Sequence, residues 1–338
     1  MTTAATQEQI RPHTLILTRP QVASLLTIEE CIPAVERIFR MHGEGKTSPP
    51  GILGVRAAEG GFHIKAGVAG LGRNYFVAKI NANFPENGRR FGLPSIQGLI
   101  ILADADRGDP LAVMDSIEIT IQRTGAATAV AAKHLSRGDS RVATICGCGN
   151  QGRIQLQSLL SVRPLERAFL YDVDPERARS LAAEFTGPLK VQPVTLGDLP
   201  SAVRQSDICV TCTPSRRFFL EREWISPGTF IAAVGADSEE KQELDPLLFR
   251  GTRIVADILD QSATIGDLHH ALESGVLRRS DVHAELGEIV AGRKEGRISN
   301  DEITIFDSTG MALQDAAAAA LVYEKASRSG AGQFVTFN

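Results

Sequence analysis

The hydrophobic pattern of the chain changes partway along its length. Before residue 115, short apolar runs alternate with turn residues such as Pro85 and Gly88, a pattern typical of strands joined by tight connections. The runs occupy residues 62–64, 75–80, 99–102 and 111–114. We therefore predict a mostly antiparallel sheet in this first part.

Helical spacing appears in three segments outside that sheet. Thr27 and Glu30 have the spacing of a capping box, and apolar residues follow them at helical intervals. Residues 119–135 and 313–327 are rich in alanine, which has the highest helix propensity. These segments predict one amphipathic helix near the start and two long helices later.

From residue 142 onward, apolar runs alternate with helical segments. Strands are expected at residues 142–146, 168–171, 208–212, 229–234 and 253–256, with helices at 153–161 and 175–184 among them. Such alternation favours a parallel, doubly wound sheet. The fold class is thus α/β, with an α+β domain at 1–127 and a Rossmann domain at 128–310. We expect the last helical segment, within 311–338, to return to the first domain.

Composition excludes several classes of protein. The 338 residues carry a formal net charge of −4, which gives no electrostatic reason to expect a nucleic-acid partner. No apolar stretch is long enough to cross a membrane, and residues 1–9 lack the pattern of a secretory signal. We therefore expect a cytoplasmic protein.

The cysteines give no indication of a metal site. Cys209 and Cys212 form a C-x-x-C, but their surroundings predict a buried strand. Residues three apart on a strand point to opposite faces, so the two thiols are poorly placed to share a metal or a disulfide. We expect no metal.

A glycine-rich motif indicates a dinucleotide cofactor. Gly147, Gly149 and Gly152 form G-x-G-x-x-G between a predicted strand and a predicted helix, with Asn150 and Gln151 inside it. The first glycine permits the tight turn, the second admits a pyrophosphate, and the third allows close helix packing. A second strand ends at Asp172, whose carboxylate can bind an adenosine ribose and would repel a 2′-phosphate. The motif predicts NAD as cofactor.

Four charged residues are candidates for substrate chemistry. Lys65 and Lys79 lie in apolar strands, where a lysine either reaches out to solvent or, if desolvated, serves in proton transfer. Arg123 lies among small residues and is either a surface charge or a carboxylate ligand. Asp237 follows a predicted strand and is either a turn residue or a general base.

A series of segments resembles the ornithine cyclodeaminase/mu-crystallin family, which includes archaeal-type alanine dehydrogenases and ketimine reductases. They occur in order between about residues 20 and 325. The matching segments are residues 92–95, 110–115, 123–127, 147–149, 213–215, 235–237, 241–244, 287–288 and 305–310. Together they are specific for the family but not for one substrate.

The resemblance implies a role for each candidate. It makes Lys79 the catalytic lysine, Arg123 the ligand of the substrate carboxylate, and Asp237 the group that activates the attacking amine or water. It places Thr124, Thr213 and Ser308 at the cofactor. It makes residues 1–127 the substrate-binding and dimerisation domain of a homodimer. Alanine dehydrogenases of the family carry a further basic pair, which Arg56 or Lys65 would replace here.

Three activities are compatible with this resemblance. A small amino-acid dehydrogenase or imine reductase consumes NAD(H) stoichiometrically. An ornithine cyclodeaminase forms proline and ammonia and regenerates its NAD within each turnover. A third possibility is a mu-crystallin-like protein that binds a nucleotide or small ligand without catalysis, which the presence of Lys79, Arg123 and Asp237 disfavours. Residues 235–237, 241–244 and 306–310 resemble the alanine dehydrogenases of the family, which favours net oxidoreduction.

Overall fold

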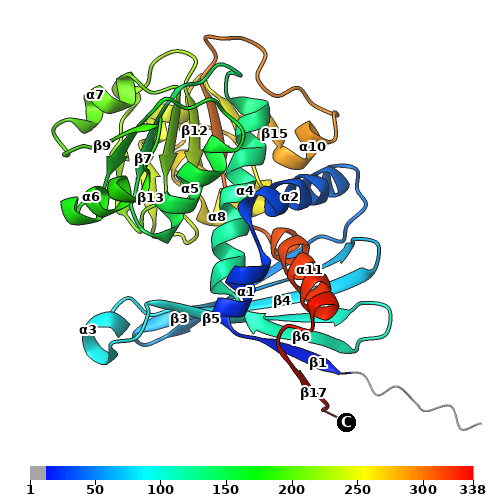
Figure 1. Ribbon diagram of the computed structural model, residues 1–338. Coiled ribbons are helices and arrows are strands. Elements are labelled where there is room, and N and C mark those ends of the chain that lie inside the picture. Colours follow the sequence, from blue (N-terminus) through cyan, green and yellow to red (C-terminus); the bar gives the residue numbers. More distant parts are fainter. Residues whose placement is uncertain (1–12, 338) are drawn as a thin grey trace, which may run out of the picture.

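The computed structural model describes residues 13–337 and contains two sheets joined by helices (Figure 1). Residues 1–9, in which the sequence shows no secretory signal, lie outside the described residues. In Figure 1 the antiparallel sheet lies at the bottom and the parallel sheet at the top, with helices α2, α4 and α11 between them. Among the described residues, no helix is long and apolar enough to cross a membrane.

The first sheet has seven strands and is mostly antiparallel, as the sequence predicts. Only β1 and β6 run parallel to each other. Its order is β17 (Gln333–Val335), β1 (Thr14–Leu17), β6 (Pro110–Asp115), β5 (Ile96–Asp104), β4 (Asn74–Asn83), β3 (Gly60–Gly70) and β2 (Gly51–Ala57). The short helix α3 (Asn87–Phe91) joins β4 to β5. Three of these strands, β1, β2 and β17, are not among those predicted from the hydrophobic pattern.

Helices cover one face of this sheet. They are α1 (Arg19–Leu25) and α11 (Ala312–Ser329), and α2 (Ile28–Gly43) packs on α11 as a further layer. The capping box of α2 is confirmed, because the Thr27 backbone N–H donates to Glu30 Oε2. Helix α11 packs on β3 and β4, and the chain after it continues as strand β17 on the edge of the same sheet.

The second sheet consists of eight parallel strands, which confirms the doubly wound fold class. Its order is β15 (Ala284–Glu285), β14 (Arg253–Ala256), β16 (Thr304–Asp307), β12 (Phe230–Ala233), β10 (Ile208–Thr211), β7 (Val142–Cys146), β8 (Arg167–Tyr171) and β9 (Lys190–Pro193). Cys209 and Cys212 pack into the apolar clusters on opposite sides of this sheet. Both are free thiols, so they form no disulfide.

Helices and short elements connect the parallel strands. The α-helices are α5 (Asn150–Leu160), α6 (Pro175–Glu184), α7 (Leu199–Arg204), α8 (Leu259–Ile265), α9 (Asp267–Glu273) and α10 (Leu286–Val290). The remaining elements are the small parallel pair β11 (Arg216–Leu220) and β13 (Gln242–Leu244) and the 3₁₀ turns at Arg222–Trp224, Pro246–Phe249 and Arg279–Asp281.

Helix α4 (Ile117–Leu135) joins the two halves. It packs against α2 and β5 on one side and against α5, β12 and β16 on the other. The domain boundary placed at 127/128 falls inside this continuous helix. Because α4 is buried along most of its length, the two halves share one apolar core rather than meeting at a flexible linker.

Candidate active site

The glycine loop, residues 147–152, connects β7 to α5 with a distinct geometry at each glycine. Gly147 has φ +104°, and a Cβ there would lie 2.8 Å from the Cys212 carbonyl oxygen. A Cβ at Gly152 would lie 1.9 Å from the carbonyl oxygen of Gly147. A Cβ at Gly149 would meet nothing within 4 Å, so the backbone there faces open space at the N-terminus of α5. That space fits a pyrophosphate bound by helix N–H groups.

Asp172 lies against the glycine loop. Its Oδ2 accepts a 2.8 Å hydrogen bond from the Cys148 N–H, and its Oδ1 accepts one of 2.9 Å from the Asp174 N–H. Asn150 and Gln151 form the first turn of α5. The structure therefore brings the acid from β8 to the loop from β7, the arrangement required to bind the ribose of a dinucleotide.

Loops after two neighbouring strands are held by one carboxylate. Glu243 accepts hydrogen bonds from the N–H groups of Thr213, after β10, and Gly235, after β12, at 2.6 and 2.9 Å. Burial, together with the charge of Asp267, raises the pKa of Glu243. Thr124, on α4, donates its hydroxyl to the Thr120 carbonyl within the same helix at 2.7 Å.

A cluster of buried charges lies where α4 and α11 meet the antiparallel sheet. Lys79 of β4 contacts both carboxylate oxygens of Asp315 through its Nζ atom, at 2.8 and 2.7 Å. Arg123 of α4 donates from Nε to the same carboxylate at 3.2 Å. The Lys79 and Asp315 side chains are 3% and 0% exposed. We call Lys79, Asp315 and Arg123 the charged cluster.

Arg123 has a second set of neighbours at the start of α11 and in the loop before it. Its Nη1 donates to Gln314 Oε1 at 3.0 Å. A Cβ at Gly310, which has φ +78°, would lie 2.4 Å from Nη1. The guanidinium therefore lies directly against the Gly310 backbone and depends on the glycine at that position.

Lys65 lies beside Lys79 on the adjacent strand and contacts the same loop. The two lysines are register partners in β3 and β4, so they share one face of the sheet. Lys65 Nζ donates to the carbonyl oxygens of Thr309 and Gly310 at 2.8 and 2.7 Å. An ammonium has three donors, so one remains for a ligand.

The loop after β16 is fixed by another buried acid. Asp257, which follows β14, accepts hydrogen bonds from the Gly310 N–H at 2.5 Å and the Thr309 hydroxyl at 3.0 Å. The Ser308 hydroxyl lies 3.5 Å from the same carboxylate. Ser308 thus belongs to a loop held between Lys65 on one side and Asp257 on the other.

Burial lowers the pKa of both lysines. Desolvation lowers the pKa of Lys79 to about 7; the charge of Asp315 opposes this shift, while Arg123 and Lys65 reinforce it. Desolvation, with the charge of Arg123, also lowers the pKa of Lys65. Because its pKa lies near neutrality, Lys79 can both donate and accept a proton under ordinary conditions.

Asp237 lies across from the lysines on the loop after β12. It forms an ion pair with Lys241, and its side chain is 50% exposed. Desolvation would raise the pKa of Asp237, but the charges of Lys241, Lys65 and His63 lower it overall. The carboxylate is therefore ionised at neutral pH and accessible from solvent, as a general base requires.

Arg56 is not grouped with these residues. It lies exposed on the edge strand β2, paired with Gly61. The position of β2 opposite Lys65 is Ile52, four residues away, which corresponds to roughly 13 Å along a strand. A contribution of Arg56 to the pocket stays a prediction.

Three acids of this region are not among the site residues predicted from the sequence: Asp315, Asp257 and Glu243. Asp315 had a usable signal, because it is the one ionised group between Leu313 and Ala320 in an apolar, alanine-rich helix. A charge in such a setting must be paired when the helix is buried. Asp257 and Glu243 follow or lie within short strands and give no comparable signal.

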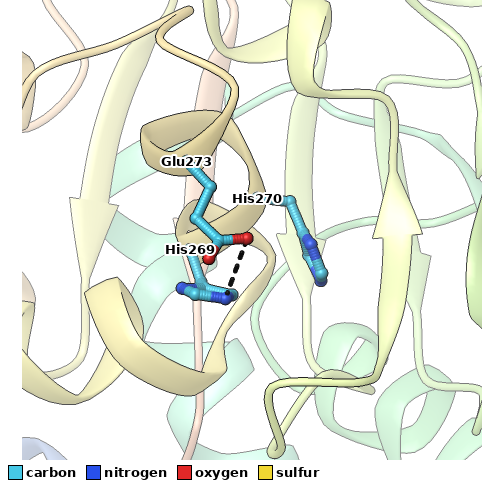
Figure 2. A group of neighbouring side chains, drawn as sticks. All are labelled: His269, His270 and Glu273. Carbon is cyan, nitrogen blue, oxygen red and sulfur yellow. Dashed lines mark ion pairs between the residues drawn. The ribbon is translucent and has the colours of Figure 1, made fainter.

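One group of histidine and carboxylate side chains could be considered for a metal (Figure 2). In the part of the chain that the structure describes, His269, His270 and Glu273 have donor atoms within 4.8 Å of one another. Each histidine already has a protein partner: His269 contacts Glu273 at 3.4 Å, and His270 Nε2 lies 2.8 Å from the Lys241 carbonyl oxygen. The expectation of no metal stays a prediction.

Comparison with known proteins gives one consistent result. Alanine dehydrogenase from Archaeoglobus fulgidus is 40% identical over 96% of this chain and 99% of its own length. The structure of an archaeal alanine dehydrogenase dimer with bound NAD superimposes with a TM-score of 0.92, at 39% identity, covering 96% of this chain and all of that one.

A second solved structure is also similar over nearly the whole chain. It is the Thermococcus litoralis Δ(1)-pyrroline-2-carboxylate reductase in complex with NADH and L-proline. The TM-score is 0.87, at 36% identity, over 95% of this chain and all of that one. The model of the ornithine cyclodeaminase/mu-crystallin family matches residues 12–330. The chain therefore belongs to the ornithine cyclodeaminase/mu-crystallin family.

Proposed function

We propose that this protein is an NAD(H)-dependent oxidoreductase that acts on the carbon–nitrogen bond of a small 2-amino acid or its imine. The observation that carries the proposal is the charged cluster, in which a lysine that titrates near neutrality lies beside a buried arginine. Lys79 suits the nitrogen of an amino acid, and Arg123 suits its carboxylate. Relatives named alanine dehydrogenase and Δ(1)-pyrroline-2-carboxylate reductase support this assignment.

The glycine loop supports NAD as the cofactor. The open space at Gly149 and the position of Asp172 fit the pyrophosphate and the adenosine ribose. Thr213 and Ser308 lie on loops after β10 and β16, beyond the carboxyl ends of strands in the same sheet, where nucleotides bind in this fold. NAD supplies the hydride chemistry when bound, and the protein supplies orientation and proton transfer.

Each residue of the site then has a separate task. Arg123 binds the substrate carboxylate and so fixes the position of Cα. Lys79 holds or takes the proton at the substrate nitrogen. Asp237 accepts a proton from the water or amine that attacks the imine carbon, and Lys65 orients the loop that carries Ser308.

The direct test is a substrate screen that follows NADH absorbance and free ammonia together. We expect turnover to be stoichiometric in NADH with an imine, or with a 2-oxo acid plus an amine. Release of ammonia and proline from L-ornithine with trace NAD and no accumulation of NADH would instead identify a cyclodeaminase. Binding of NADH without turnover of any of these compounds would favour a non-catalytic binding protein.

We further propose that two copies of the chain associate through the outer face of the antiparallel sheet. Figure 1 shows no helix on this face, which lies opposite α2 and α11. Six large apolar side chains on it are 37–57% exposed: Leu53, Val55, Phe62, Ile80, Leu99 and Ile101. A contiguous apolar surface of this kind is typical of an interface. The similar archaeal enzyme is a dimer.

Sedimentation of the purified protein tests this association. We expect a dimer for the natural chain and a monomer for Leu99→Glu, which places a charge at the centre of the outer face. Leu196→Glu is the matched control, because Leu196 is 59% exposed but lies in the other half of the chain. A dimer that survives Leu99→Glu would contradict this interface. The cytoplasmic location stays a prediction.

A further inference from the structure

Asp315 contacts both partners of the charged cluster from a different part of the chain. It lies in the first turn of α11, whereas Lys79 comes from β4 and Arg123 from α4. Its Oδ1 is the shared acceptor, at 2.8 Å from Lys79 Nζ and 3.2 Å from Arg123 Nε. One carboxylate oxygen therefore determines where both cations lie relative to each other.

A carboxylate in this place is costly without its partners. Asp315 is fully buried and is followed by a run of alanines. The next turn of the helix therefore has no polar side chain that could hydrogen-bond to the carboxylate in place of water. Burial would raise the pKa of Asp315, but the charges of Lys79 and Arg123 lower it overall. The group is thus a permanent anion at neutral pH.

The surroundings of Lys79 show what this anion does. Lys65 and His63 of β3 lie on the same face of the sheet, and Arg123 approaches from α4. On the other side, β5 presents Ile100 at the paired position and brings no charge. Desolvation, Arg123 and Lys65 all lower the pKa of Lys79, and Asp315 raises it. Asp237 approaches from the loop after β12, but it acts on Lys65 and His63. Asp315 is therefore the anion in direct contact with Lys79, and without it the nearest charges would be the cations Arg123 and Lys65.

Asp315 also leaves Arg123 competent to bind a substrate. It engages Nε, and Gln314 engages Nη1, so two of the five guanidinium donors are used. The remaining three can bind a carboxylate at the outer edge of the guanidinium. The guanidinium plane itself is held against Gly310.

We propose that Asp315 is the positioning residue of this active site, which orients Lys79 and Arg123 together and keeps the lysine protonated until it acts on the substrate nitrogen. The inference rests on the proposed function, because it assumes that Lys79 transfers a proton and Arg123 binds the substrate. Because Asp315 is fully buried behind these two side chains, it acts on the reaction through Lys79 and Arg123. Asp315 is then the residue that sets the pH range of the reaction.

The test is the pH dependence of kcat/KM for Asp315→Asn, measured in the reductive direction. The ammonium form of Lys79 is the active form there, so activity of the natural enzyme should fall as pH rises through about 7. Removing the anion that favours the ammonium should move this limb at least one pH unit lower. At pH 7 the expected loss is about fivefold or more, rising toward tenfold at higher pH and shrinking as the pH is lowered.

A matched control lies on the same helix. Glu324 accepts a hydrogen bond from the Tyr75 hydroxyl at 3.1 Å and so also joins α11 to β4 through a carboxylate. Glu324→Gln should leave the limb in place, because Glu324 is outside the charged cluster. Asp315→Glu, which retains the charge, should restore the limb to its natural position even if the rate stays lower. Asp315→Ser replaces Asp315→Asn if the amide variant does not fold.

The outcomes separate this inference from the proposed function. A uniform loss of activity at every pH, with the limb in its natural position, would show a purely structural role and overturn the inference. Undiminished turnover in Lys79→Ala would instead overturn the proposed function. NADH binding by each variant shows that the parallel-sheet half is folded.

Discussion

The glycine loop and the charged cluster use the chain in contrasting ways. The loop is six consecutive residues that follow β7 and include the start of α5, and its functional atoms belong to the backbone. The cluster is three side chains separated by more than forty residues at the nearest, brought together by β4, α4 and α11. A local backbone site such as the loop can be recognised in the sequence, and an added Cβ is expected to impair its binding. A site built from distant side chains, such as the cluster, is expected to lose its function when one charge is removed.

The largest effect on turnover is expected from a substitution that disrupts only the charged cluster. Lys79→Ala should lower turnover by roughly 10²- to 10⁴-fold, the usual contribution of general acid–base catalysis. NADH affinity should stay within about twofold, because the glycine loop is untouched. Steady-state kinetics and NADH fluorescence titration measure the two quantities. Parallel loss of NADH binding would show that the two regions are not independent.

Two substitutions of glycine by alanine in the glycine loop test cofactor binding and packing separately. Gly149→Ala adds a methyl group in open space, so thermal stability should not change while NADH affinity falls about tenfold or more. Gly152→Ala puts the same methyl 1.9 Å from the Gly147 carbonyl oxygen, so stability should fall as well. Differential scanning calorimetry and NADH titration compare the pair. Equal melting temperatures would contradict the packing role of Gly152.

A subtler change sharpens the view of Arg123. Arg123→Lys keeps the charge but replaces a planar fork by a single point, so KM should rise about tenfold with a smaller change in kcat. Its bonds to Asp315 and Gln314 would also be lost in part. Initial-rate measurements over a range of substrate concentrations separate the two constants. An unchanged KM would remove Arg123 from the carboxylate site.

The smallest effect is expected at the edge of the glycine loop. Asp172→Ser should narrow the preference for NAD over NADP by several-fold, because it removes the charge that would repel a 2′-phosphate. The effect is limited because Asp172 also accepts the Cys148 N–H, which a serine oxygen can still do. The ratio of kcat/KM with the two cofactors is the measurement. A natural preference for NADP(H) would show that the assignment of Asp172 is wrong.

Much of the fold was predictable because its periodicities are local. Strands β7 and β14 occur where the apolar pattern places them, and the alternation of strands and helices gave the parallel sheet. Helix α5 begins three residues earlier than predicted, because its first turn is formed by the second half of the glycine loop. Short edge strands such as β17 were missed, since a three-residue strand has no period and forms only against its neighbour.

The sequence by itself determined the family and the dinucleotide loop, because both rest on motifs of contiguous residues. The candidates Lys79, Arg123 and Asp237 came from their local surroundings and from the resemblance to the family. Only the tertiary structure decided which charges meet. Asp315 reaches Lys79 across 236 positions, and Lys65 reaches Gly310 across 245. Asp315 is conspicuous as a charge in an alanine-rich helix, but the sequence does not show its partner. A buried ion pair or hydrogen bond brings two distant positions together without constraining the residues around them. The protonation of Lys79 follows from burial and from those partners, so it too is a property of the folded chain.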